Sequence, residues 1–346
     1  MSARTANRGS VSRMPGRFAV SHSELDAPDA ARPTRYHRER AKSIIMRNSS
    51  PDLPFTQSIN PYRGCEHGCI YCYARPNHAY VDLSPGQDFE SEIFCKDNAP
   101  EVLRDSLRKR GYRCQPIVLG TVTDPYQPIE REKRLTRQLI QVLVDCQHPF
   151  SLITKSSLVE RDLDLLAPMA RAGRASVAIS VTTLDNRLKG QLEPRASGGR
   201  ERLRVIRELS RAGVPVSVLV APVIPFINDH ELEDIVEQVA QAGASSVGYV
   251  LLRLPHEVGP LWQQWLAQHY PDRADKVMGI MRELHGGAVY DSRWHVRQTG
   301  QGAWAALLRQ RFEKARRDAG LDVPRREALD CSGFRPPGAH GQLALW

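Results

Sequence analysis

The sequence predicts an α/β fold in which parallel strands form a partial (β/α)6 barrel. Six apolar segments of strand length alternate with helix-like segments across residues 56–255, which is typical of successive βαβ units. Segments such as 216–223, VSVLVAPV, are apolar on both faces, as parallel strands covered by helices are. Three helical segments end in Ala-Gly just before a strand, at 172–173, 212–213 and 242–243. This ending favours a short helix-to-strand connection.

Hydrophobic periodicity and glycine stops give the expected order of elements. Strands are expected at 56–60, 116–123, 150–156, 175–183, 214–224 and 245–252. Helices are expected at 99–111, 130–146, 159–173, 198–213 and 229–243. Because active sites of such barrels lie at the carboxyl ends of the strands, the segments that follow strands are the candidates for chemistry.

Composition divides the chain of 346 residues into four parts. The barrel is flanked by a polar segment rich in Arg, Ser and Pro, by a helical extension and by a tail rich in Pro and Gly. We expect the first of these to be largely disordered. The parts are a basic N-terminal arm at 1–55, the barrel at 56–255, a helical C-terminal extension at 256–330 and a flexible tail at 331–346.

The charge balance is basic, with a formal net charge of +9. Residues 1–50 carry nine Arg and one Lys against four acidic residues, a net charge of +6, and 307–326 form a second basic run. Such an excess indicates a polyanionic partner, which makes nucleic acid the favoured partner class, although Arg-rich arms can also serve solubility alone. No apolar run approaches the roughly 20 residues of a membrane span, and the N-terminus lacks the apolar core of a secretory signal. We therefore expect a cytoplasmic protein with reduced thiols and no membrane partner.

The stretch NPYRGCEHGCIYCYARP, residues 60–76, holds Cys65, Cys69 and Cys72 in a C-x3-C-x2-C spacing. A structural zinc site normally takes four protein ligands, and a disulfide framework needs an even number of cysteines. Three thiolates suit an iron–sulfur cluster that keeps one iron open to a small molecule. The alternative is a zinc ion with His67 or His78 as fourth ligand.

This spacing, with Tyr71 just before the last cysteine, resembles the signature of the radical S-adenosylmethionine (SAM) superfamily. Further stretches resemble its spore photoproduct lyase-like, or DNA repair photolyase-like, branch: LGTVTDPYQPIE, LITKS, AISVTT, LEPRA and VLVAPVIP. The resemblance implies a [4Fe-4S] cluster held by Cys65, Cys69 and Cys72, with SAM on the open iron. It also implies an external electron donor that reduces the cluster, and cleavage of SAM to a 5′-deoxyadenosyl radical.

The resemblance also suggests which side chains bind SAM. Thr123 and Asp124 match a hydroxyl–acid step beside SAM, where the carboxylate could receive the SAM ammonium, but Asp124 could instead cap the DPYQP turn. Lys155, at the end of a strand, suits the SAM carboxylate or a phosphate. The alternative for Lys155 is a surface lysine whose stem packs on apolar groups.

Three further residues complete the set of candidate cofactor contacts. Ser180 could hydrogen-bond the ribose or be a satisfied strand serine. Arg195 could grip a carboxylate with two hydrogen bonds, or pair with Glu193. Tyr71 could pack on the adenine or on the core.

One position departs from the branch pattern. The lyase uses a cysteine three residues before the acid that follows strand two, and this sequence has Thr121 there. We therefore expect a radical SAM enzyme that acts on nucleic acid, most readily damaged or modified DNA, without the lyase's hydrogen-return step. The alternatives are modification of RNA, protein or a metabolite, and a DNA-associated protein with a structural or redox-sensing cluster.

The last five residues, QLALW, resemble the peptide with which bacterial replication and repair proteins dock on the sliding clamp. The contacts would come from Gln342, Leu343, Leu345 and Trp346, with the apolar side chains in a groove and the amide setting orientation. A tail that folds back onto the barrel is the alternative.

Overall fold

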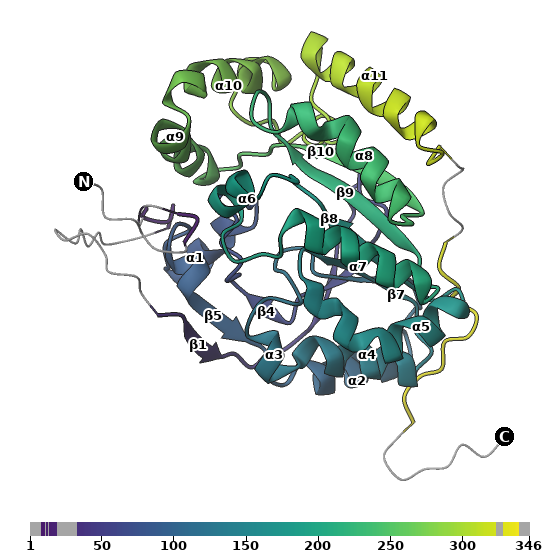
Figure 1. The fold of residues 1–346 in the computed structure, drawn as a ribbon. Coiled ribbons are helices and arrows are strands. Elements are labelled where there is room, and N and C mark those ends of the chain that lie inside the picture. Colours follow the sequence, from purple (N-terminus) through teal and green to yellow (C-terminus); the bar gives the residue numbers. More distant parts are fainter. Residues whose placement is uncertain (1–7, 11, 13, 19–32, 323–327, 339–346) are drawn as a thin grey trace.

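The computed structural model describes residues 8–10, 12, 14–18, 33–322 and 328–338. At its centre is a curved seven-stranded sheet in the order β10-β9-β8-β7-β6-β3-β2 (Figure 1). The six strands from β3 to β10 run parallel, and β2 is antiparallel to β3. The strands are β2 (Ile45–Arg47), β3 (Gln57–Ile59), β6 (Ile117–Leu119), β7 (Phe150–Thr154), β8 (Ala175–Ser180), β9 (Val216–Val223) and β10 (Ser246–Leu251).

Helices follow the parallel strands in the chain. They are α2 (Ala99–Arg108), α3 (Glu130–Lys133), α4 (Leu135–Asp145), α5 (Leu163–Arg171), α6 (Asn186–Leu192), α7 (Gly199–Arg211) and α8 (Leu232–Gln241), with 3₁₀ turns at Ser157–Asp162 and Asp229–Glu231. Of these, α2, α4, α5, α7 and α8 cover the outside of the sheet (Figure 1). The edge strands β2 and β10 do not pair with each other, so the barrel is open. This confirms the prediction of an α/β fold with a partial (β/α)6 barrel.

A second, three-stranded sheet was not predicted; one of its strands precedes β2 in the chain and the other two lie between β3 and β6. It pairs β1 (Arg35–Arg38), β5 (Glu92–Cys95) and β4 (Tyr62–Arg63), and η1 (Arg75–Val81) and α1 (Asp88–Ser91) precede β5. The strands β1 and β2 thus place residues 35–38 and 45–47 of the expected disordered arm in the two sheets. These strands have two to four residues and little hydrophobic alternation, so only pairing with distant segments stabilises them.

The helix expected at 130–146 is two helices, because the chain turns at Arg134, whose φ is +51°. The carboxylate of the buried Glu130 accepts hydrogen bonds from the backbone N–H groups of Thr136 (3.0 Å) and Arg137 (3.3 Å). It thus satisfies amides that the first turn of α4 leaves unpaired. The same carboxylate accepts from Arg161 at 2.7 Å, so the break is fixed by a buried acid.

The strand expected at 116–123 is shorter than predicted, since β6 ends at Leu119. Gly120 follows with φ +92°, and a Cβ there would lie 2.5 Å from the carbonyl oxygen of Ile153 in β7. Only glycine allows both this conformation and this approach. The loop that carries Thr123 and Asp124 therefore begins directly after β6.

The C-terminal extension consists of α9 (Val258–His269), α10 (Pro271–Leu284) and α11 (Gly302–Asp318). The segment between α10 and α11 spans the open side of the barrel. There the N–H of Leu251 at the end of β10 donates to the carbonyl of Gln298 (2.8 Å), and Arg297 binds Asp52 through two hydrogen bonds of 2.7 and 2.5 Å.

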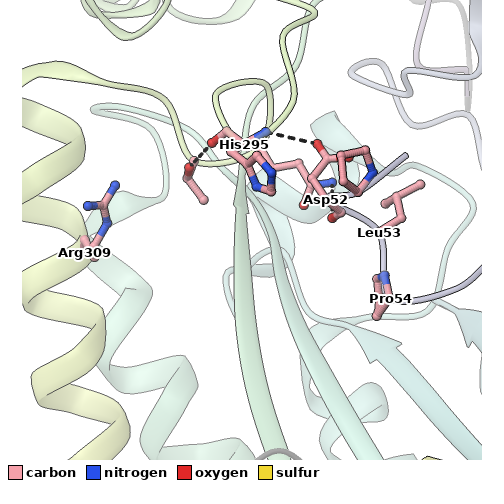
Figure 2. A pocket seen from close by; sticks show the side chains of 8 residues that line it. Asp52, Leu53, Pro54, His295 and Arg309 are labelled. Carbon is pink, nitrogen blue, oxygen red and sulfur yellow. Dashed lines mark hydrogen bonds between the residues drawn. The ribbon is translucent and has the colours of Figure 1, made fainter. Parts of the chain in front are cut away.

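A cavity of about 450 Å³ lies at this junction (Figure 2). Its lining includes Asp52, His295 and Arg309 and none of the candidate cofactor contacts.

The described part of the tail packs on the barrel. Arg335 N–H donates to the carbonyl of Cys146 (2.8 Å), and the Phe334 ring lies 5.2 Å from the ring of His148 and 5.5 Å from that of Tyr112. Residues 334 and 335 thus pack on the barrel, while the alternative that the last five residues fold back is not tested by these contacts. Gln342, Leu343, Leu345 and Trp346 lie outside the described residues, and sliding-clamp docking through them stays a prediction.

None of the helices in the described part of the chain combines the length and apolar character that crossing a membrane requires.

Candidate active site

The three cysteines lie in one loop between β4 and η1, close to the carboxyl end of β3. Cys65 and Cys69 are buried and Cys72 is half-buried, and all three thiols are free. Backbone hydrogen bonds tighten the loop, from Cys72 N–H to the carbonyl of Cys69 (3.2 Å) and from Gly68 N–H to that of Cys65 (3.4 Å). Gly68 has φ +68°, and a Cβ there would lie 2.8 Å from Glu90 Oε2, so glycine is needed at this point of the loop.

The donor set fits a [4Fe-4S] cluster: three soft ligands, sheltered from water, in one short loop. Burial raises the pKa of all three thiols, that of Cys69 to about 12. The thiols therefore need a compensating cation to ionise, and iron supplies one.

The two histidines of the zinc alternative have other partners. His78 is buried, its Nε2 lies 3.0 Å from the carbonyl oxygen of Glu92, and burial lowers its pKa to about 4. His67 Nδ1 lies 3.3 Å from Asp124 Oδ2.

A fully buried ion pair supports the loop, and no local sequence pattern indicates it. Arg75 Nη2 lies 2.5 Å from Glu90 Oε1, and Arg75 also donates to the carbonyl of Cys69 (2.9 Å). Glu90 accepts the N–H groups of Gly9 (2.9 Å) and Ser10 (2.8 Å). The described N-terminal residues thus lie directly against the cysteine loop.

Asp124 is saturated by protein hydrogen bonds. Its Oδ1 accepts from Tyr126 N–H (2.9 Å) and Thr154 Oγ1 (2.7 Å), and its Oδ2 accepts from Lys155 N–H (2.8 Å). Burial alone would raise its pKa, but His67 and these donors lower it to about 2. Because a carboxylate offers about four lone-pair sites, this geometry favours the capping alternative, and contact with the SAM ammonium stays a prediction.

Thr123 is also turned toward the protein. Its hydroxyl donates to the carbonyl of Gly64 (2.6 Å) and accepts from Gln127 Nε2 (3.1 Å). Thr123 thereby joins the β6 loop to the residue just before Cys65. Its contact with SAM stays a prediction.

Lys155 follows β7 and is half-buried. Its charge acts to lower the pKa values of Cys69, Cys72 and Glu193. Lys155 therefore acts electrostatically on two of the three thiols, and its contact with SAM stays a prediction.

Tyr71 and Ser180 are buried. The Tyr71 ring belongs to the hydrophobic core, and its hydroxyl donates to Glu193 and lies 3.2 Å from Thr182 Oγ1. The Ser180 carbonyl accepts from Arg202 Nη1 (2.9 Å). These contacts agree with the core-packing alternative for Tyr71, and SAM contacts of either residue stay predictions.

Arg195 is paired, but with a different acid from the one expected. Its Nη2 lies 3.2 Å from Glu66 Oε1, next to Cys65, and its N–H donates to the carbonyl of His67 (3.3 Å). Glu193 instead binds Arg202, and although burial alone would raise the pKa of Glu193, the Arg202 charge and its hydrogen bonds lower it to about 2. Arg195 thus braces the cysteine loop.

Comparison with known proteins agrees with this geometry. Residues 59–239 match the profile of the radical SAM superfamily. An uncharacterized protein of Mycobacterium tuberculosis is 36% identical over 252 residues, which cover 71% of this chain and 74% of that protein. The chain belongs to the radical SAM superfamily. Its cofactors are accordingly a [4Fe-4S] cluster and S-adenosylmethionine.

Two further comparisons concern proteins with named roles. The sporulation killing factor maturation protein of Bacillus subtilis is 39% identical over 194 residues, 56% of this chain and 41% of that protein. The solved structure of a spore photoproduct lyase mutant superposes with a TM-score of 0.57 at 16% identity, covering 82% of this chain and 79% of that one. A related structure of the same lyase contains AdoMet and a dinucleoside spore photoproduct. This likeness shows a shared fold.

Proposed function

We propose that the chain is a cytoplasmic radical SAM enzyme that acts on nucleic acid, in DNA repair or base modification. The observation that carries the choice of nucleic acid is the positive charge, +9 overall. Part of it lies on and beside the short strands β1 and β2, where Arg40 and Arg47 are exposed, whereas Arg38 is exposed but paired with Asp97 (2.7 Å). Surfaces of this kind attract the phosphate backbone irrespective of sequence.

In this proposal, Cys65, Cys69 and Cys72 would hold the cluster, and the chemistry that cluster and SAM would supply is radical abstraction of a hydrogen atom. Lys155 would bind an anionic group of SAM. Arg195 keeps the loop in place through Glu66, and the buried surroundings exclude water from the reacting groups.

Thr121 limits the kind of reaction. Its hydroxyl lies 3.1 Å from Asn60 Nδ2 and its carbonyl accepts from Tyr73, and a hydroxyl cannot replace a thiol as a hydrogen-atom donor. We therefore propose a damaged or modified base other than the spore photoproduct, or a different way of ending the radical reaction.

Two other functions remain as alternatives. The similarity to a protein named for killing-factor maturation favours modification of a peptide, and RNA or a metabolite would use the same cofactors. A DNA-associated protein whose cluster is structural or redox-sensing would not need SAM cleavage.

The test is anaerobic reconstitution of the full chain with iron and sulfide, followed by reduction in the presence of SAM. Release of 5′-deoxyadenosine is expected, and a Cys69→Ala variant should release none. A reduced, iron-loaded protein that leaves SAM intact would support the structural alternative. Incubation with irradiated or modified DNA, with deuterium in the substrate, should then give labelled 5′-deoxyadenosine. Transfer of deuterium to 5′-deoxyadenosine from a deuterated peptide, and not from deuterated DNA, would refute the choice of nucleic acid as substrate.

A further inference from the structure

Arg253 follows β10 at the mouth of the barrel and carries a charge that the described residues do not neutralise. Its Nη2 donates to the hydroxyl of Tyr290 at 3.3 Å, and its Nε is buried without a hydrogen-bond partner. Within the described part of the chain, Arg253 forms no ion pair. Its neighbour Arg297, by contrast, is bound by Asp52 through two hydrogen bonds. A partly buried cation without an anion costs stability, which points to a role in binding.

The guanidinium of Arg253 lies over the ring of Tyr73, 4.8 Å from its centroid. Tyr73 comes directly after Cys72, and its hydroxyl donates to the carbonyl of Thr121. The side chain is therefore anchored at its tip, yet Tyr73 is 44% exposed. An anchored, exposed aromatic ring beside the cysteine loop is a surface on which a planar group can stack.

The contact joins the two ends of the barrel, because Tyr73 follows the first parallel strand, β3, and Arg253 follows the last, β10. The charge of Arg297 also reaches the Tyr73 hydroxyl, and Trp294, in the same loop as Arg297, is 55% exposed. The charge of Arg253, unpaired among the described residues, and two exposed aromatic rings, those of Tyr73 and Trp294, thus occur together on the open side of the barrel.

A second polar group near Arg253 lacks partners. The imidazole of His285 is buried, with the residue 3% exposed, and neither of its ring nitrogens has a hydrogen-bond partner in the described residues. The His285 ring packs against that of Tyr290, with centroids 6.0 Å apart, and the Arg253 charge acts on it. The ring nitrogens of His285, near Arg253, therefore make no hydrogen bond to the described residues.

We propose that Tyr73 and Arg253 form the subsite for one nucleotide of the substrate, with the base stacked on the Tyr73 ring and a phosphate on the free N–H groups of Arg253. Arginine binds phosphate in a planar, two-bonded geometry, and aromatic rings and guanidinium planes stack nucleobases of unpaired strands. The subsite requires a single-stranded or extruded nucleotide. The inference rests on the proposed function and adds the residues that hold the substrate.

The test uses the full chain, reconstituted without oxygen, as wild type and as R253Q, R253K and Y73L. Arg211→Gln is the matched control, since Arg211 is an exposed arginine at the end of α7 whose Nη1 donates to Glu208 (2.9 Å). Fluorescence anisotropy measures the Kd for a labelled single-stranded oligonucleotide at several salt concentrations from about 50 to about 200 mM. A second oligonucleotide carries uncharged methylphosphonate linkages.

For R253Q we expect about fivefold weaker binding or more, and a slope of log K against log salt that is smaller by about 0.7, as for the loss of one phosphate contact on a single strand. For R253K we expect the same slope of log K against log salt as for the wild type, because lysine keeps the positive charge. Y73L weakens binding roughly fivefold or more at an unchanged slope, because stacking is not ionic. R211Q behaves as wild type. Thermal melting and iron content of each variant establish that it is folded.

Three results would overturn the subsite, and the first two separate it from the proposed function. If the wild type binds the oligonucleotide with a salt-dependent Kd and folded R253Q is unchanged, the subsite is wrong and the proposed function stands. If the wild type shows no salt-dependent binding to nucleic acid, the proposed function fails together with it. Should R253Q not fold, equal wild-type affinity for the charged and the methylphosphonate strands would refute the subsite.

Discussion

Replacing Glu90 by glutamine tests how the cysteine loop is supported. Glu90 is fully buried and accepts hydrogen bonds from Arg75 Nη2 (2.5 Å) and from the N–H groups of Gly9 and Ser10 (2.9 and 2.8 Å). The glutamine amide has one acceptor oxygen where the carboxylate has two, and its NH₂ group then faces a donor. The guanidinium of Arg75, itself fully buried, loses its counter-charge.

Removing one partner of a buried ion pair costs about 3–5 kcal/mol, because the other charge stays buried and uncompensated. This is a large part of the roughly 5–15 kcal/mol that stabilise a typical domain. Arg75 also holds the carbonyls of Cys69, Pro85 and Gly86, so the loss is expected to loosen the cysteine loop as well as lower the free energy of unfolding.

Urea unfolding of the wild type and Glu90→Gln, both without oxygen, measures the free energy. Hydrogen exchange measures protection of the Gly9 and Ser10 amides. Glu208→Gln, which removes the charge from a pair on the surface of α7, should change stability by no more than about 0.5 kcal/mol. A loss below about 1 kcal/mol for Glu90→Gln, with both amides still protected, would refute the reasoning.

Three further changes have defined outcomes. Lys155→Met should weaken SAM binding roughly tenfold, the effect of one charged hydrogen bond, and an unchanged Kd by equilibrium dialysis would remove Lys155 from the site. His148 is buried, and burial lowers its pKa from 6.5 to about 4, so the unfolded chain binds a proton at a higher pH than the folded protein does. The free energy of unfolding should therefore fall by about 3 kcal/mol as the pH drops from 6.5 to 4. Urea titrations should show a weaker pH dependence for His148→Gln, and parallel curves for the variant and the wild type would contradict this. Gly9→Ala places a Cβ 1.7 Å from the Gly68 carbonyl oxygen, whereas the Cβ of Gly111→Ala meets nothing within 4 Å. Hydrogen exchange in the N-terminal segment should therefore become faster in Gly9→Ala and stay unchanged in Gly111→Ala. Equal protection of that segment in the two variants would contradict the packing of Gly9 on Gly68.

The parallel barrel could be predicted because its strands and helices carry continuous local patterns. The buried runs at Phe150–Thr154 and Val216–Val223 are strands in the structure. The strands β1 and β2 could not be found, since RYHR and IMR have no strand pattern of their own. The break at Arg134 depends on the Glu130 carboxylate folding back on α4, which periodicity does not encode.

The candidate site was predictable where chemistry and spacing coincide in one short stretch, as for Cys65, Cys69 and Cys72. Partnerships between distant segments were not. The pairing of Glu193 with Arg202 instead of Arg195, and of Arg75 with Glu90, follows from which side chains face each other in the folded protein. The placement of Arg253 over Tyr73 likewise depends on the curvature that brings β3 and β10 toward one mouth.

The contact between Arg297 and Asp52 matters for anyone who wishes to transplant this chemistry into another scaffold. Residues 59–239, the part that matches the superfamily profile, contain all three cysteines but neither member of this contact. An excised core of that length would also lack β2, most of β3 and β10, so β6 and β9 would each have an unpaired hydrogen-bonding edge that favours self-association. The smallest useful graft therefore reaches from before Asp52 to beyond Arg297.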